Sequence, residues 1–181
     1  MLLMDNSGPL HIIKIITEVF ERLGIKYLVG GSFASSFHGI PRATQDIDIV
    51  ADIKSEQVNK LVKALEGAFY IDEQMVQGAV KQSSSFNIIH LNTMYKVDIF
   101  PFTQDKYSKE EMDRREKYKI SKDPVQEVYF ASAEDIILNK LHWYKIGGEI
   151  SERQWDDVLG VIKVQHKNLD LDYLKQKAKY L

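Results

Sequence analysis

The sequence contains no cysteine among its 181 residues. Disulfide bonds and thiolate metal sites are therefore excluded, so any metal must bind to oxygen or imidazole ligands. Apolar runs approaching the roughly 20 residues of a membrane helix are also missing, and so is a secretion signal near the start. We expect a soluble protein of the reducing cytoplasm, with no membrane partner.

The sequence also has almost no excess of one charge sign over the other, since its formal net charge is only -2. The chain as a whole therefore has no strong attraction to nucleic acid. Basic side chains do gather at 114–119 and at 175–179. The simpler interpretation of each cluster is a solvated helix face, and a local phosphate-binding patch is the alternative. Repeats and low-complexity segments are absent from the sequence, which is typical of one ordered domain.

Apolar periodicity and capping residues predict the secondary structure. The predicted helices cover 10–23, 32–38, 55–66 and 169–180, and two more begin after the capping-box residues Ser132 and Ser151. The predicted strands cover 26–29, 46–51, 68–71, 85–91, 94–100 and 125–130. The charged segment 107–117 is compatible with a helix, whereas the polar segment 74–84 is predicted to be a loop.

This order of elements predicts an α+β fold. Helices and strands alternate first, strands then dominate the middle of the chain, and helices end it. We expect a mixed β-sheet flanked by helices, followed by a small C-terminal helical segment. The core would span 1–130, and the C-terminal helices, 131–181, would pack on it as one continuous unit.

Two acids stand close together in the predicted strand 46–51. Asp46 and Asp48 are two residues apart, so both project from one face with about 6.5 to 7 Å between their Cα atoms. Their charges would repel by about 3 kcal/mol at roughly 5 Å and an effective dielectric near 20. A divalent cation would remove this repulsion, and carboxylate oxygens suit Mg²⁺. The alternative is the wet face of a half-exposed strand. Asp98, in the strand 94–100, would add a third acid.

A glycine turn precedes these acids. Gly30, Gly31 and Ser32 lie between a predicted strand and a predicted helix. Glycines at such a point let backbone N–H groups approach a phosphate, and the N-terminus of the helix favours negative charge. An ordinary tight turn is the alternative interpretation. Together with the two acids, the turn predicts phosphate donors beside metal ligands.

The combined pattern resembles a known signature. Gly30-Gly31-Ser32 followed by Asp46-Ile47-Asp48-Ile49 is similar to the DNA polymerase β-type nucleotidyltransferase superfamily, and Asp98 resembles its third carboxylate. The fuller string 30–48 is similar to the AbiEii toxins and the minimal nucleotidyltransferases. Segments 133–141 and 153–157 resemble two further blocks of these proteins, so the resemblance covers most of the chain.

The resemblance implies a reaction. A nucleoside monophosphate would pass from a nucleoside triphosphate to an acceptor hydroxyl with the help of two Mg²⁺ ions. Asp46 and Asp48 would bind both ions. Asp98 would hold the ion on the acceptor side and help to remove the proton of the hydroxyl. Gly30, Gly31 and Ser32 would position the β- and γ-phosphates.

Three further residues are candidates for contact with the nucleotide. Lys140 falls within the apolar arc of its predicted helix, so its ammonium must either reach the protein surface or meet a negative partner. Such a lysine is associated with the nucleotide in the proteins that the chain resembles. Arg42 and Thr44 flank the acids, where they would touch phosphate or orient Asp46. For Arg42, a salt bridge within the turn is the alternative.

The acceptor is the least determined part of the prediction. The resemblance implies a toxin that modifies transfer RNA or another target, together with a possible antitoxin protein as partner. A protein acceptor, or a small molecule such as an antibiotic, is the alternative within the enzyme class. From a different class, the chain would be a non-catalytic nucleotide-binding or interaction module that kept the fold.

Overall fold

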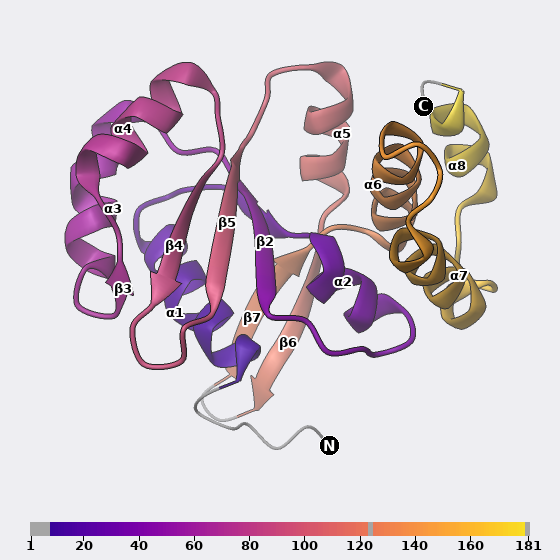
Figure 1. The fold of residues 1–181 in the computed structure, drawn as a ribbon, viewed down its shortest axis with the longest axis horizontal. Coiled ribbons are helices and arrows are strands. Elements are labelled where there is room, and N and C mark those ends of the chain that lie inside the picture. The colour runs from indigo at the N-terminus through magenta and orange to yellow at the C-terminus, as the bar shows by residue number, and fades with distance from the viewer. Residues whose placement is uncertain (1–7, 123–124, 180–181) are drawn as a thin grey trace.

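The computed structural model describes residues 8–122 and 125–179. Within them, seven strands form one sheet in the order β3-β4-β5-β2-β1-β7-β6 (Figure 1). The strands are β1 Tyr27–Val29, β2 Asp46–Ala51, β3 Phe69–Tyr70, β4 Phe86–His90, β5 Lys96–Pro101, β6 Glu116–Lys122 and β7 Val125–Phe130. The helices are α1 Pro9–Arg22, α2 Gly31–His38, α3 Val58–Leu65, α4 Glu73–Gln82, α5 Lys106–Arg114, α6 Ala133–Ile146, α7 Glu152–Gln165 and α8 Leu171–Ala178, and a 3-10 turn covers Ser55–Gln57.

The sheet is mixed, which confirms the predicted α+β fold. β2 is parallel to β5 and antiparallel to β1, and β1 is parallel to β7. Along β2 the side chains alternate, with Ile47 and Ile49 fully buried and Asp46 and Asp48 on the other face. This alternation follows from the two-residue period of a strand. The central strands therefore anchor the acids through a buried apolar face.

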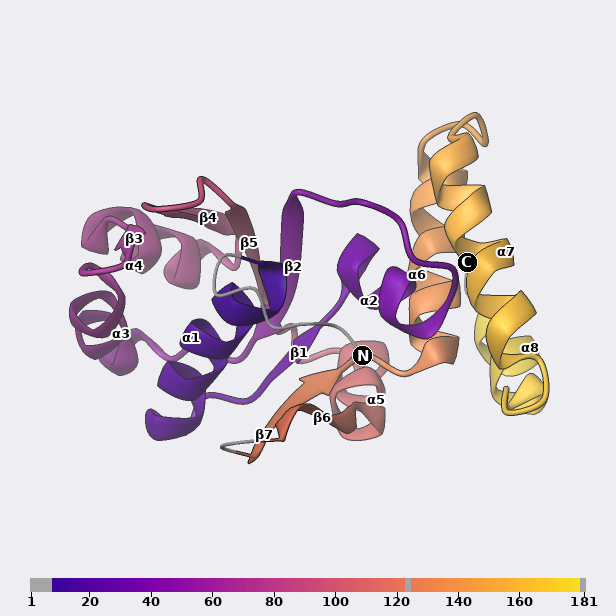
Figure 2. The same ribbon diagram turned by 90° about the horizontal axis from the view of Figure 1, so that it is seen from below.

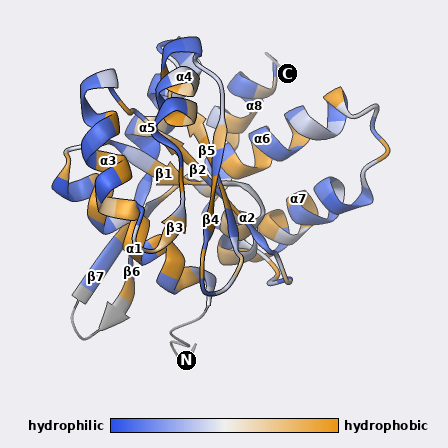
Figure 3. Ribbon diagram, turned by 60° about the vertical axis from the view of Figure 1, so that its left-hand side comes forward, coloured by the Kyte–Doolittle hydropathy of each residue, from blue (hydrophilic) through white to orange (hydrophobic). Residues whose placement is uncertain are grey.

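Helices gather at both ends of the sheet. α1, α3 and α4 lie together on one side, while α6, α7 and α8 lie at the other side beyond α2 (Figures 1 and 2). Buried side chains of α1 and α3, such as Ile12, Ile16 and Leu61, join the strands in one core. Figure 3 shows this pattern, with apolar residues concentrated on the central strands and the inner faces of the helices. No helix in the described part of the chain is long and apolar enough to cross a membrane.

The predicted loop at 74–84 is wrong, because most of it forms α4. The Asp72 side chain caps the helix by accepting a hydrogen bond from the Met75 backbone N–H. Val76 and Ala79 are buried against the core. The helix ends at Ser83, which adopts the left-handed conformation with a φ of 51°. A short buried stripe and two caps are thus enough to form a helix from a mostly polar segment.

β6 was not predicted. It pairs antiparallel with β7 at the edge of the sheet. Tyr118 and Ile120 are half-buried and alternate with exposed Lys117 and Lys119. Charged side chains are typical of edge strands, where they discourage pairing with other chains. The helix expected at 107–117 is therefore shorter, and it ends at Arg114.

Candidate active site

The turn between β1 and α2 brings a carboxylate close to a helix N-terminus. Gly30 donates its backbone N–H to the Asp48 carbonyl at 2.9 Å, and the Asp48 carboxylate accepts a hydrogen bond from the Ser32 backbone N–H. Gly31 has a φ of +59°, in the region that favours glycine. A Cβ atom at Gly31 would lie 1.8 Å from Oδ2 of Asp48. Glycine at this position therefore allows Asp48 to approach α2.

The three predicted acids share one face of β2 and β5. The register of these parallel strands places Asp48 beside Asp98 and Asp46 beside Lys96. Burial raises the pKa of Asp48, and the negative charge of Asp98 raises it further. Nζ of Lys96 lies 2.8 Å from Oδ2 of Asp98 and 3.8 Å from Oδ1 of Asp46. The Lys96 ammonium thus provides a counter-charge for the acidic face.

The ligands on this face suit a hard divalent cation. Asp46, Asp48 and Asp98 offer only oxygen atoms, and burial together with the negative charge of Asp98 raises the pKa of Asp48, so a further positive charge there would be favourable. In residues 8–122 and 125–179, no three His, Asp or Glu side chains already surround a common ion position. Binding of a cation would therefore require the carboxylates to converge and the Lys96 ammonium to move away from Asp98.

A second cluster joins four segments of the chain at the first turn of α2. The Ser32 hydroxyl accepts hydrogen bonds from Nη2 of Arg42 at 2.7 Å and from Nζ of Lys140 at 3.1 Å. Asp157 of α7 binds the same two cations. Its carboxylate accepts from Nε and Nη2 of Arg42 at 2.7 and 2.8 Å, and it lies 2.8 Å from Nζ of Lys140. The structure thus brings Ser32, Arg42 and Lys140 together.

This cluster carries a net positive charge in a mostly buried place. Lys140 is 5% exposed and Asp157 is 7% exposed. Burial alone would raise the pKa of Asp157, but the hydrogen bonds from Arg42 and Lys140 outweigh it and hold that pKa below its usual value. Two cations and one anion next to a helix N-terminus form a good environment for phosphate.

Thr44 lies outside this cluster. Its hydroxyl donates a hydrogen bond to the Asp46 carbonyl at 3.2 Å. Thr44 therefore supports the beginning of β2, whereas Arg42 forms its salt bridge with α7 and not within the turn.

Asp157 is the site residue that the sequence reasoning missed. Within the segment 153–157, Arg153 and Asp156 are both exposed. Asp157 instead lies on the buried side of α7 with Val158 and Val161. A charged side chain on the apolar side of a helix is the signal that identified Lys140. The same signal applied to this helix would have identified Asp157.

A cavity of about 460 Å³ lies among α5, α6 and α8. It is lined by Asp105, Lys106, Tyr107, Leu138, Asn139, His142, Gln176 and Lys177. Next to it, the carboxylate of Glu111 accepts a hydrogen bond from Asn139, and burial raises the pKa of Glu111 to about 7. The cavity has the size of a small-molecule site and polar groups along its wall.

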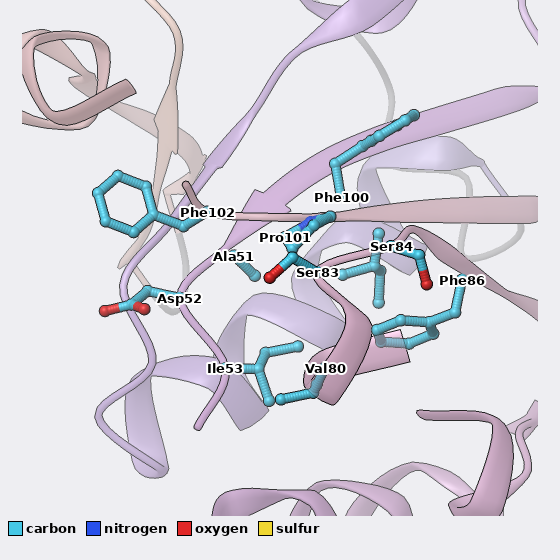
Figure 4. A pocket seen from close by; sticks show the side chains of 11 residues that line it. Ala51, Asp52, Ile53, Val80, Ser83, Ser84, Phe86, Phe100, Pro101 and Phe102 are labelled. Atoms are coloured by element: carbon cyan, nitrogen blue, oxygen red, sulfur yellow. The ribbon is translucent and has the colours of Figure 1, made fainter. Parts of the chain in front are cut away.

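A much smaller pocket, of about 60 Å³, lies where β2 and β5 end. Figure 4 shows that Ile53, Val80 and Phe86 point toward it. It has room for little more than water, and the nearest acid, Asp52, already forms an ion pair with Lys54 at 2.6 Å. We assign no ligand to this pocket.

Comparisons with known proteins give no sequence relative. No family model matches the chain, and no curated protein is similar to it in sequence. Solved structures do match. The lincosamide antibiotic adenylyltransferase LnuA, bound to lincomycin, is 16% identical, with 88% of this chain and 99% of that chain covered and a TM-score of 0.56.

Two other solved structures are similar to this chain over most of its length. The antibiotic-resistance factor ANT(2'')-Ia is 12% identical, with 97% of this chain and 92% of that chain covered and a TM-score of 0.60. A nucleotidyltransferase-like protein from Paracoccidioides brasiliensis is 15% identical, with 94% and 86% covered and a TM-score of 0.58. At these identities the likeness establishes the fold alone. The chain therefore has the nucleotidyltransferase fold.

Proposed function

We propose that this protein transfers a nucleoside monophosphate from a nucleoside triphosphate to an acceptor hydroxyl. The observation that carries the proposal is the meeting of an acidic face with a basic cluster at one helix N-terminus. Asp48 takes part in both, because it is the register partner of Asp98 and accepts the Ser32 backbone N–H. Ser32 in turn binds Arg42 and Lys140. This arrangement supports the proposal, because it would bind a triphosphate and a metal ion side by side.

Each group has a role in the proposed reaction. Asp46, Asp48 and Asp98 would hold two Mg²⁺ ions, which neutralise charge on the phosphate oxygens when bound. The acceptor oxygen forms a bond to the α-phosphorus, the bond to the bridging oxygen breaks, and pyrophosphate leaves. Asp98 takes the proton of the acceptor hydroxyl.

The basic cluster would bind the leaving phosphates. Gly30, Gly31 and Ser32 would offer backbone N–H groups to the β- and γ-phosphates. Arg42 and Lys140 would neutralise their charge. Much of the rate would come from this positioning and charge neutralisation.

For the acceptor we propose two classes. The resemblance to AbiEii toxins and minimal nucleotidyltransferases supports a transfer RNA end, and with it a cytoplasmic toxin that an antitoxin protein restrains. The cavity of about 460 Å³ among α5, α6 and α8 supports a small molecule instead. Antibiotics are named with LnuA and ANT(2'')-Ia, whose structures contain lincomycin and adenylyl-2''-tobramycin.

The basic segment at 114–119 gives little support to an RNA acceptor. Arg114 forms an ion pair with Glu134, and Lys117 forms one with Glu127. These charges are largely neutralised within the protein.

Label transfer tests the proposal. The protein is incubated with Mg²⁺, labelled nucleoside triphosphates, and either cellular RNA, cellular protein or a small-molecule extract. We expect label to move to one acceptor class and to disappear with Asp46→Asn or Asp48→Asn. Undiminished transfer by both variants would contradict the assignment. Triphosphate binding without transfer to any acceptor would favour the non-catalytic module.

A further inference from the structure

The outer face of α7 carries apolar side chains that the described chain covers only in part. The Trp155 ring lies 5.4 Å from the ring of Tyr144 in α6, and the rest of the row remains accessible. α7 lies with α6 and α8 at the end of the molecule away from α1, α3 and α4 (Figure 2). Its inner face is buried through Val158 and Val161. On the outer face, Trp155, Leu159 and Ile162 are 44%, 48% and 39% exposed. Their spacing of four and three residues puts them in one stripe along the helix. Exposed apolar stripes of this kind mark interaction surfaces.

Charges beside the stripe are separated by sign. Glu152 and Asp156 lie at the N-terminal end of α7, and Lys163 and Lys167 lie at and just beyond its C-terminal end. At helical spacing all four fall on the same side of the stripe. Asp156 and Lys163 are two turns apart, which is too far for pairing within one helix. None of the four takes part in the ion pairs found among the described residues.

We propose that this stripe binds a second copy of the chain, with the two α7 helices antiparallel. A two-fold axis between Leu159 and Gly160 places Asp156 opposite Lys163 of the second copy. The same axis places Glu152 opposite Lys167. A single position of the two-fold axis therefore forms both acid–lysine pairs. Each pair occurs twice in a symmetric dimer. A parallel two-fold arrangement would instead put the charged rows of the two copies on opposite sides of the contact, so neither pair would form.

The inner side of α7 is already packed within the chain. Gly160 belongs to this buried side and lies against Ile40 of the segment that follows α2. Asp157 and its partners Arg42 and Lys140 lie on the inner side of α7, so the dimer leaves the candidate site unchanged. The inference is thus independent of the proposed function. One helix face is smaller than the usual interface of about 800 Å² per partner, so the dimer is weak and depends on concentration.

Sedimentation equilibrium on the full chain tests this with two charge-reversed variants. One is Glu152→Lys/Asp156→Lys, and the other is Lys163→Glu/Lys167→Glu. The wild type is expected to approach twice the mass of one chain as concentration rises. Each variant alone keeps the mass of one chain, because like charges then face each other. An equal mixture of the two variants regains the doubled mass, because opposite charges meet again.

Two controls keep the test decisive. Leu159→Ser removes the centre of the stripe without changing charge and is expected to abolish the doubled mass. Met94→Ser, at an exposed turn far from α7, is expected to preserve it. A wild type that keeps the mass of one chain at all concentrations overturns the proposal. So does a doubled mass that both charge-reversed variants retain, or a mixture that stays at the mass of one chain.

Discussion

Among single residues, Asp157 has the clearest structural role, because it forms ion pairs with two cations. Its carboxylate forms ion pairs with Arg42 and Lys140. Both of these cations also donate a hydrogen bond to the Ser32 hydroxyl. Removing it leaves the Lys140 ammonium buried without its carboxylate partner. We expect Asp157→Ala to lower the free energy of unfolding by about 3 to 5 kcal/mol.

Urea denaturation at a protein concentration where the chain is monomeric measures this difference, and Asp156→Ala is the matched control. Asp156 is the adjacent acid on the same helix, but it is exposed. Its loss should change the free energy of unfolding by less than about 0.5 kcal/mol. Equal effects of the two substitutions would contradict a special role for Asp157.

Lys96 competes with any cation at the acidic face. Its ammonium lies 2.8 Å from Asp98 and 3.8 Å from Asp46, where a bound metal ion would also lie near these carboxylates. We expect Lys96→Met to increase the affinity for Mn²⁺ several-fold in calorimetric titration, without any nucleotide present. Lys54→Met is the control, since Lys54 pairs with Asp52 at 2.6 Å away from these acids. An affinity that Lys96→Met leaves unchanged would show that Lys96 is no competitor.

Glu111 makes stability depend on pH. Burial, and then the charge of Asp135, raise the pKa of Glu111 from 4.5 to about 7. A raised pKa in the folded state stabilises the protein below the unfolded pKa, and this contribution is lost as pH rises through the folded pKa. Between pH 4.5 and about 7 the free energy of unfolding should fall by roughly 2 to 4 kcal/mol from this group.

Denaturation of Glu111→Gln at both ends of that pH window measures this contribution. The amide still accepts the hydrogen bond from Asn139, but it does not ionise. The variant should lose most of the fall in stability seen in the wild type. A fall of the same size in both proteins would assign the pH dependence to other groups.

Residue patterns revealed part of the candidate site before the fold was known. Asp46 and Asp48 are two apart on one strand, and Lys140 is a cation in an apolar arc, so local periodicity singled them out. Asp157 was missed because its neighbour Asp156 presents the same chemistry on the exposed side of the helix. That Lys96 meets Asp46 depends on the pairing of β2 with β5, which no local pattern contains.

Among the secondary-structure elements, the turn before α2 determines how closely Asp48 approaches the helix N-terminus. Gly31 combines a φ of +59° with a Cβ position 1.8 Å from Asp48. We expect Gly31→Ala to displace Asp48, to destabilise the fold by more than about 1 kcal/mol and to abolish any nucleotide-dependent rise in melting temperature.

Gly78→Ala is the matched control for this substitution. Gly78 lies within α4, and a Cβ atom there meets nothing within 4 Å. This change should stabilise the protein by about 0.5 to 1 kcal/mol, because alanine favours helix. Thermal unfolding with and without Mg²⁺ and ATP compares the two variants. A Gly31→Ala protein that responds to nucleotide as the wild type does would contradict the role of the turn.

Elements with a clear apolar stripe and caps were predicted correctly, and weakly patterned ones were not. α1 and α3 have buried faces that their sequences display plainly. α4 buries only a narrow stripe and relies on tertiary packing, so its polar composition pointed to a loop. β6 gains its structure from pairing with β7. A strand that depends on its partner gives little signal of its own.

At the scale of the whole molecule, the candidate site is assembled from distant parts of the chain. The helix turn at 30–32, the strands β2 and β5 and the helices α6 and α7 all contribute, and they meet through the mixed sheet and the packing of α7 on α2. The fold is shared with structures of antibiotic adenylyltransferases at 12 to 16% identity. These parts describe how a nucleotide would be bound. We propose the cavity among α5, α6 and α8 for a small-molecule acceptor, and the sequence does not reveal the shape of this cavity.

A crystal structure with Mg²⁺ and a non-hydrolysable nucleoside triphosphate tests the central claim most directly. The account predicts that the β- and γ-phosphates lie at the backbone of Gly31 and Ser32, within reach of Lys140. It also predicts that the metal lies among Asp46, Asp48 and Asp98, with the Lys96 ammonium displaced from Asp98. A triphosphate bound elsewhere, or metal-free carboxylates at saturating Mg²⁺, would contradict it.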